Sequence, residues 1–103
     1  MSRPDLANLI QRFEDETSTP IGPAAERVML ARARERHAAD PGDPLVADLM
    51  DVDGRLFQRL IESVLARFER DRAFANWLRI GGRTALEAAM RAELSQMTDG
   101  VRR

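Results

Sequence analysis

The sequence LVADLMDVDGRLFQRLIESVLARFER, residues 45–70, carries the clearest helical periodicity in the chain. Its large apolar side chains fall into two adjacent ranks: Leu45, Leu49, Val52, Leu56, Leu60 and Val64 in the first, and Phe57, Ile61, Leu65 and Phe68 in the second. At about 100° per residue, the two ranks cover more than half of the helix circumference, which is more than one neighbouring helix needs. The pattern therefore predicts either the central helix of a bundle or a helix shared with a second subunit.

The same stretch contains polar residues that interrupt its apolar arc. Asp53 and Gly54 would both lie within the arc if the helix were continuous. Because a charged group on a buried face is costly, we expect a kink or a short break near residues 51–54. The DVDG sequence is not predicted to bind calcium, since Leu49 and Leu60 stand where a calcium loop requires Asp and Glu.

Helical patterns also occur outside this stretch, and no part of the chain shows the alternation of a strand. The further helices are expected at about residues 2–16, 23–39, 71–80 and 84–97, with residues 17–23 as a loop. The sequence thus predicts an all-α fold, a small bundle of four to five helices with a long central amphipathic helix. Residues 1–103 are expected to form a single helical domain, in which residues 98–103 are a frayed tail.

The glycine pair Gly81-Gly82 separates the last two expected helices. Gly81 is expected to take the left-handed conformation that ends a helix, and Gly82 to give clearance at the turn. A capping box that begins at Thr84 is expected to start the last helix. The alternative is an anion site at this helix start, flanked by Arg79 and Arg83.

The residue types present limit the chemistry that the chain can perform. Among its 103 residues there is no cysteine and no lysine, and His37 is the only histidine. Disulfides, thiolate metal sites, Schiff-base chemistry and a phosphate-binding P-loop are thereby excluded. His37 has no second imidazole to complete a metal site. We therefore predict that the protein is not an enzyme and uses no cofactor and no metal.

The sequence also shows no sign of membrane insertion or export. No apolar run is long enough to span a bilayer, and the first residues lack the apolar core of a secretion signal. Together with the absence of cysteine, these features predict a cytoplasmic protein that makes no membrane contact.

Charge is distributed in alternating blocks, although the net charge is only −1. Residues 27–37 hold four arginines, whereas residues 38–54 hold five aspartates and no arginine. Such blocks suit helices that pair with one another or with a complementary partner, and they fit poorly with one continuous basic surface. The alternative function considered is a small DNA- or RNA-binding regulator. Its phosphate contacts would be Arg27, Arg32, Arg34 and Arg36.

The leading functional prediction rests on the excess of apolar residues in the middle of the chain. Aromatic, methionine and arginine side chains are enriched in protein interfaces. The predicted partner or dimer interface consists of Phe57, Ile61, Phe68, Phe74, Trp77 and Arg79. We predict a non-enzymatic protein–protein interaction module, a small adaptor, antiactivator or inhibitor that forms a homodimer and uses Trp77 as an anchor.

Overall fold

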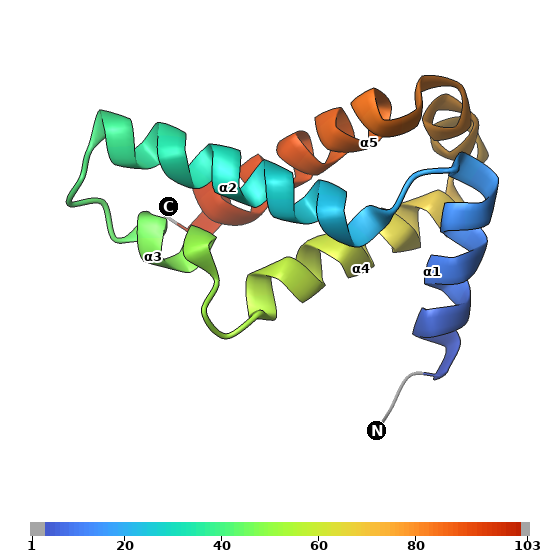
Figure 1. Ribbon diagram of the computed structural model, residues 1–103, viewed down its shortest axis with the longest axis horizontal. Coiled ribbons are helices and arrows are strands. Elements are labelled where there is room, and N and C mark those ends of the chain that lie inside the picture. Colours follow the sequence, from blue (N-terminus) through green and yellow to red (C-terminus); the bar gives the residue numbers. More distant parts are fainter. Residues whose placement is uncertain (1–3, 102–103) are drawn as a thin grey trace.

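The computed structural model describes residues 4–101, which form five α-helices and no strand. The helices are α1 (Pro4–Thr17), α2 (Ile21–Ala39), α3 (Leu45–Met50), α4 (Arg55–Arg70) and α5 (Arg72–Val101). Figure 1 shows α2 crossing in front of α4 and α5, while α1 stands at the end of the molecule opposite α3. The predicted all-α bundle is confirmed.

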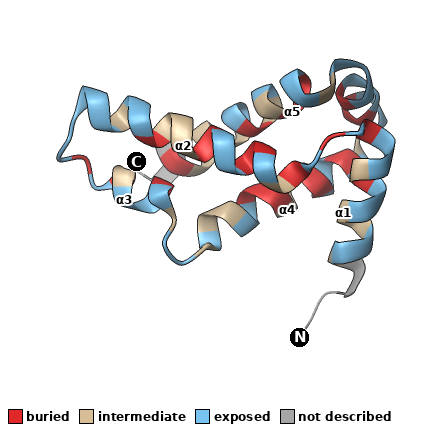
Figure 2. Cartoon of the chain, in the orientation of Figure 1, coloured by how far each residue is buried: buried red, intermediate tan, exposed pale blue. Residues whose placement is uncertain are grey.

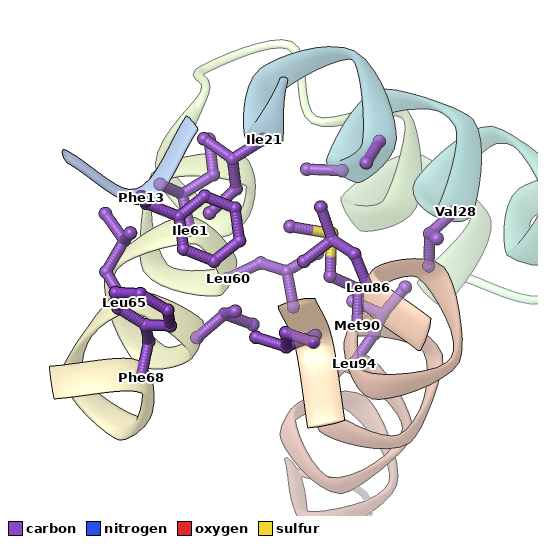
Figure 3. Packing of buried hydrophobic residues seen from close by; sticks show 14 of the residues in the cluster. Phe13, Ile21, Val28, Leu60, Ile61, Leu65, Phe68, Leu86, Met90 and Leu94 are labelled. Carbon is purple, nitrogen blue, oxygen red and sulfur yellow. The ribbon is translucent and has the colours of Figure 1, made fainter. Parts of the chain in front are cut away.

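The central position in the bundle belongs to α4. It packs against α1, α2 and α5, and the apolar residues of both its ranks from Leu60 to Phe68 are buried. Figure 3 shows Leu60 among side chains of these three helices: Phe13 from α1, Ile21 and Val28 from α2, and Leu86, Met90 and Leu94 from α5. The rings of Phe13 and Phe68 meet edge to face, with centroids 4.9 Å apart. This part of the apolar arc is therefore covered within one protomer, without a second subunit.

The predicted interruption at residues 51–54 is confirmed. Asp51 ends α3 in the left-handed conformation, with φ 52° and ψ 57°, and Gly54 has φ 74° immediately before α4. The Asp51 carboxylate accepts hydrogen bonds from the backbone N–H groups of Leu56 (3.2 Å) and Phe57 (2.6 Å). Asp51 therefore both ends α3 and caps the start of α4.

The connection between α1 and α2 is shorter than predicted. α2 begins at Ile21 rather than at Pro23, so the expected loop at residues 17–23 is reduced to its middle part. Glu14 explains the early start, because its Oε2 accepts a hydrogen bond from the Ile21 N–H at 3.1 Å. A helix start leaves such N–H groups without a backbone partner. Pro23 then lies in the first turn of α2, where no N–H donor is needed.

The two glycines of α5 divide it into two helical halves, and their roles are exchanged relative to the prediction. Gly82, not Gly81, has the positive φ, with φ 60° and ψ −138°. Gly81 supplies the clearance, because a Cβ at this position would collide with the side chain of Ala85. Beyond the bend, Glu87, expected to complete the capping box, accepts a hydrogen bond from Arg27 of α2 at 2.8 Å.

The end of α5 extends further than predicted. The helix continues past Thr98, where a frayed tail was expected to begin, as far as Val101, the last residue that the structure describes. Thr98 is buried, and its hydroxyl donates a hydrogen bond to the Leu94 carbonyl at 2.9 Å. Residues 1–3, where the first helix was expected to begin, and residues 102–103 lie outside the described residues.

Candidate interaction surfaces

The described part of the chain exposes four large apolar side chains, in two places. Trp77 and Ile80, on the first half of α5, are 46% and 88% exposed. Met50, at the end of α3, and Val52, on the loop that follows, are 55% and 93% exposed. The loop after α3 and the bend of α5 lie far apart in Figure 1, and Figure 2 colours much of both as exposed. The protein therefore has two separate apolar surfaces.

The first, called here the Trp77 surface, consists of Trp77, Ile80 and a neighbouring hollow. Trp77 and Ile80 are three residues apart and lie on the same side of α5. The hollow has a volume of about 420 Å³ and is lined by Arg67, Asp71, Ala73, Phe74, Trp77, Ala88, Ala89 and Ala92. Because both halves of α5 contribute alanines to this lining, the bend at Gly82 is what forms the hollow.

An aromatic pair and a charge pair border this hollow. The rings of Phe74 and Trp77 have centroids 6.0 Å apart, and the Arg67 guanidinium lies over the Phe74 ring, 4.2 Å from its centroid. The Arg67 Nε also lies 3.8 Å from the Asp71 carboxylate, so this pair carries no net charge. A hollow walled by short side chains and edged by an aromatic ring is suited to receive a bulky apolar side chain.

The structure separates the residues of the predicted interface. Trp77 is exposed, whereas Ile61, Phe68 and Phe74 are buried and Phe57 is half-buried at the start of α4. Ile61 and Phe68 belong to the core of the protomer and are not part of an exposed surface. Phe74 is buried but is among the residues that line the hollow.

Arg79, the last residue of the predicted interface, lies on the other side of α5 from Trp77. Two residues along a helix correspond to a rotation of about 200°. The Arg79 Nη2 and Nε both donate to Glu16 Oε1, at 2.7 and 3.2 Å. Arg79 therefore joins α5 to the acidic end of α1. Arg83, the other arginine expected to flank an anion, lies 3.7 Å from Glu87, so both arginines already face carboxylates.

The arginines considered for nucleic-acid binding connect α2 to the rest of the protomer. Arg27 pairs with an acid of α5 at 2.8 Å, and Arg36 lies 3.8 Å from an acid of the turn before α3. Arg32 is half-buried, and Arg34 is exposed. At least two of the four arginines thus face carboxylates of the same protomer, which leaves less of this helix to bind a phosphate backbone.

The second apolar surface was not predicted. Met50 borders a hollow of about 330 Å³, which is lined by Glu26, Met29, Leu30, Leu49, Met50, Asp51, Gly54 and Phe57. This hollow and Met50 are called the Met50 surface below, whereas Val52, two residues further along the chain, lines a different hollow. From its helical spacing, Val52 was placed in the buried rank of the central helix. The break expected at residues 51–54 could have indicated that Val52 is exposed, because residues in a loop do not follow the helical period.

The fold and these surfaces define a small all-α bundle with two separate apolar surfaces. No protein-family model, curated protein or solved structure matches the chain. Within residues 4–101, no helix combines the length and apolar character needed to cross a bilayer. In the same residues, no three His, Asp or Glu side chains converge on a point where a metal ion could bind.

Proposed function

We propose that this protein is a non-enzymatic protein–protein interaction module, a small cytoplasmic adaptor, antiactivator or inhibitor, which forms a homodimer through the Trp77 surface. The observation that carries the proposal is the position of Trp77, half-exposed beside an open apolar hollow. Tryptophan is largely buried in most folded proteins. It is also among the residue types most enriched at the energetic centres of interfaces.

Self-association is favoured because one surface holds both a projecting side chain and a hollow. In a two-fold dimer the same surface of each protomer contacts its copy. Trp77 of one protomer would then occupy the hollow beside Trp77 of its partner. Arg67 and Asp71 at the rim have opposite charges, so the two rims meet without net repulsion.

The surface area of Trp77 that is exposed in the protomer, and could be buried in a dimer, indicates a weak dimer. A large aromatic side chain buries about 150–250 Å² in total, and 46% of Trp77 remains exposed in the protomer. At about 25 cal/mol per Å², the two copies of Trp77 together contribute roughly 3–6 kcal/mol. Association itself costs about 4–15 kcal/mol. Ile80 and the remaining contacts must supply the rest of the free energy of association. Because Trp77 is the largest single contribution, the dimer depends strongly on it.

Replacement of Trp77 by alanine tests the proposal. We expect the wild-type chain to dimerise with a Kd of about 1–100 μM, and Trp77→Ala to lower the affinity at least about a hundredfold. The far-UV circular dichroism spectrum is expected to stay helical, since the Trp77 side chain is only half-buried. Sedimentation velocity over a range of protein concentrations measures the dimer, and circular dichroism the fold.

Two further variants form a matched control, because each replaces an exposed aliphatic side chain by serine. Ile80→Ser changes the Trp77 surface and is expected to weaken the dimer about tenfold. Val52→Ser changes the loop after α3, far from the Trp77 surface, and is expected to leave the dimer unchanged. A wild-type chain that stays monomeric up to about 500 μM contradicts the proposal, and so does a folded Trp77→Ala variant that dimerises like the wild type.

A further inference from the structure

We propose that the Met50 surface is a second docking site, which binds the cationic amphipathic helix of a partner protein. The inference goes beyond the dimer proposed above and does not depend on it, since the Met50 and Trp77 surfaces involve different parts of the fold (Figure 1). It rests on an apolar hollow with acidic lining residues, bordered by Met50, whose side chain is more than half exposed.

The hollow offers apolar contact from three helices. Met29 and Leu49 are buried at its base, while Leu30 and Phe57 are half-buried and keep part of their side chains accessible. These residues come from α2, α3 and α4, so the hollow lies where the three helices meet. Met50 at its edge has a flexible side chain, and methionine adapts well to the shape of a partner. The hollow can therefore receive bulky aliphatic side chains.

The charge around the hollow determines the sign of the charge that a partner must carry. Its charged lining residues, among those that the structure describes, are Glu26 and Asp51, both acidic. Residues 44–54, which include α3 and the loop after it, hold three aspartates and no arginine. Arg55 and Arg59, the first arginines after this segment, are not among the lining residues of this hollow and line a different one next to the end of α5, which shares Asp51 with it. Complementarity therefore requires lysine or arginine beside the apolar residues of the partner.

Backbone hydrogen bonds hold the edge of the hollow in place. The Asp51 N–H donates to the Ala47 carbonyl at 3.3 Å, and the Gly54 N–H donates to the Asp51 carbonyl at 3.1 Å. The Asp51 side chain in turn accepts the N–H groups of Leu56 and Phe57. A site that is formed before binding loses less conformational entropy than a mobile loop.

A partner helix suits this hollow better than a second copy of the chain. An amphipathic helix presents apolar anchors one turn apart to a groove, and its flanking cations would lie near Glu26 and Asp51. The Trp77 surface of a second copy has a rim without net charge, so it cannot neutralise these carboxylates. Docking of Trp77 of one copy into the Met50 hollow of another would also be a head-to-tail contact. Each pair would then keep one unused Trp77 surface and one unused Met50 surface, to which further copies could add.

Two synthetic peptides of about 18 residues, both amphipathic helices, test the proposal. One is composed of leucine and lysine, and the other carries glutamate in place of each lysine. Isothermal titration calorimetry with the full chain is expected to give a Kd of about 10–100 μM for the lysine peptide. Binding of the glutamate peptide is expected to be at least about tenfold weaker. Amide chemical shifts are expected to change most at residues 49–57.

Four variants locate the binding. Met50→Ser and Glu26→Gln are each expected to weaken binding of the lysine peptide about fivefold. Ile80→Ser removes an apolar side chain from the other surface, and Glu69→Gln removes one negative charge near the opposite end of α4. Both are expected to change the affinity less than about twofold. The chemical-shift changes give the same answer independently if a variant fails to fold.

Several outcomes would overturn the inference. They are equal affinity for the two peptides, equal weakening by Glu26→Gln and Glu69→Gln, and shift changes centred away from both residues 26–30 and residues 49–57. Failure of the dimer proposal is a distinguishable result. A chain that remains monomeric and still binds the lysine peptide at residues 49–57 supports the Met50 site while rejecting the Trp77 dimer.

Discussion

Gly82 has a backbone conformation that only glycine adopts without strain. With φ 60° and ψ −138°, an L side chain would place its Cβ against its own backbone. No neighbouring atom lies within 4 Å of a Cβ built there, so the restriction comes from the backbone and not from packing. Gly81 is the opposite case, because a Cβ there meets the side chain of Ala85.

Replacement of Gly82 by alanine measures this strain. We expect Gly82→Ala to lower the free energy of unfolding by about 1–3 kcal/mol, the usual cost of a sparsely populated backbone conformation. Gly22→Ala is the matched control, since Gly22 is helical and a Cβ there has open space. It is expected to raise the free energy of unfolding by about 0.4–1 kcal/mol. Urea denaturation followed by circular dichroism measures both, and equal stability of Gly82→Ala and wild type would rule out the bend as described.

At the scale of the elements, the features that depend on helical periodicity could be predicted from the sequence, whereas those that depend on contacts between helices could not. The central helix and its break at residues 51–54 followed from spacing and from the cost of burying Asp53. The start of α2 did not, because it depends on a hydrogen bond from Ile21 to Glu14, seven residues earlier. Which apolar residues stay exposed depends likewise on neighbouring helices, whose positions the period of a single helix does not specify. For this reason the exposure of Met50 was not predicted. Trp77 was predicted as an anchor from its residue type.

Two residues of the same predicted rank now have opposite environments, and their substitution tests the division into α3 and α4. Leu60 is fully buried, so Leu60→Ala is expected to lower the free energy of unfolding by about 2–5 kcal/mol. Val52 is exposed on the loop, so Val52→Ala is expected to change it by less than about 0.5 kcal/mol. Thermal and urea denaturation measure the difference. Similar losses for the two variants would indicate one continuous buried helix instead.

Across the whole molecule, charge pairs join helices that the core already packs. They link α1 to α4 and α5, and α2 to α5: Arg12–Glu69, Glu16–Arg79, Arg27–Glu87 and Glu35–Arg91. Exposed pairs of this kind contribute only about 0–1 kcal/mol each, so their main effect is on helix orientation. With these charges engaged within the protomer, the two apolar surfaces are the regions that we propose for partner binding. A dimer formed through Trp77 would present two Met50 surfaces, and two linked sites bind a bivalent partner with higher avidity.

The half-exposed ring at position 77 has a spectroscopic consequence. The chain contains one tryptophan and no tyrosine, so its near-ultraviolet emission comes almost entirely from Trp77. Docking of this indole into an apolar hollow removes water from around it, and we expect its emission maximum to move to shorter wavelength as the protein concentration rises. A spectrum that does not change with concentration while the protein assembles would place the contact elsewhere. The unlabelled protein thus reports optically on its own proposed interface.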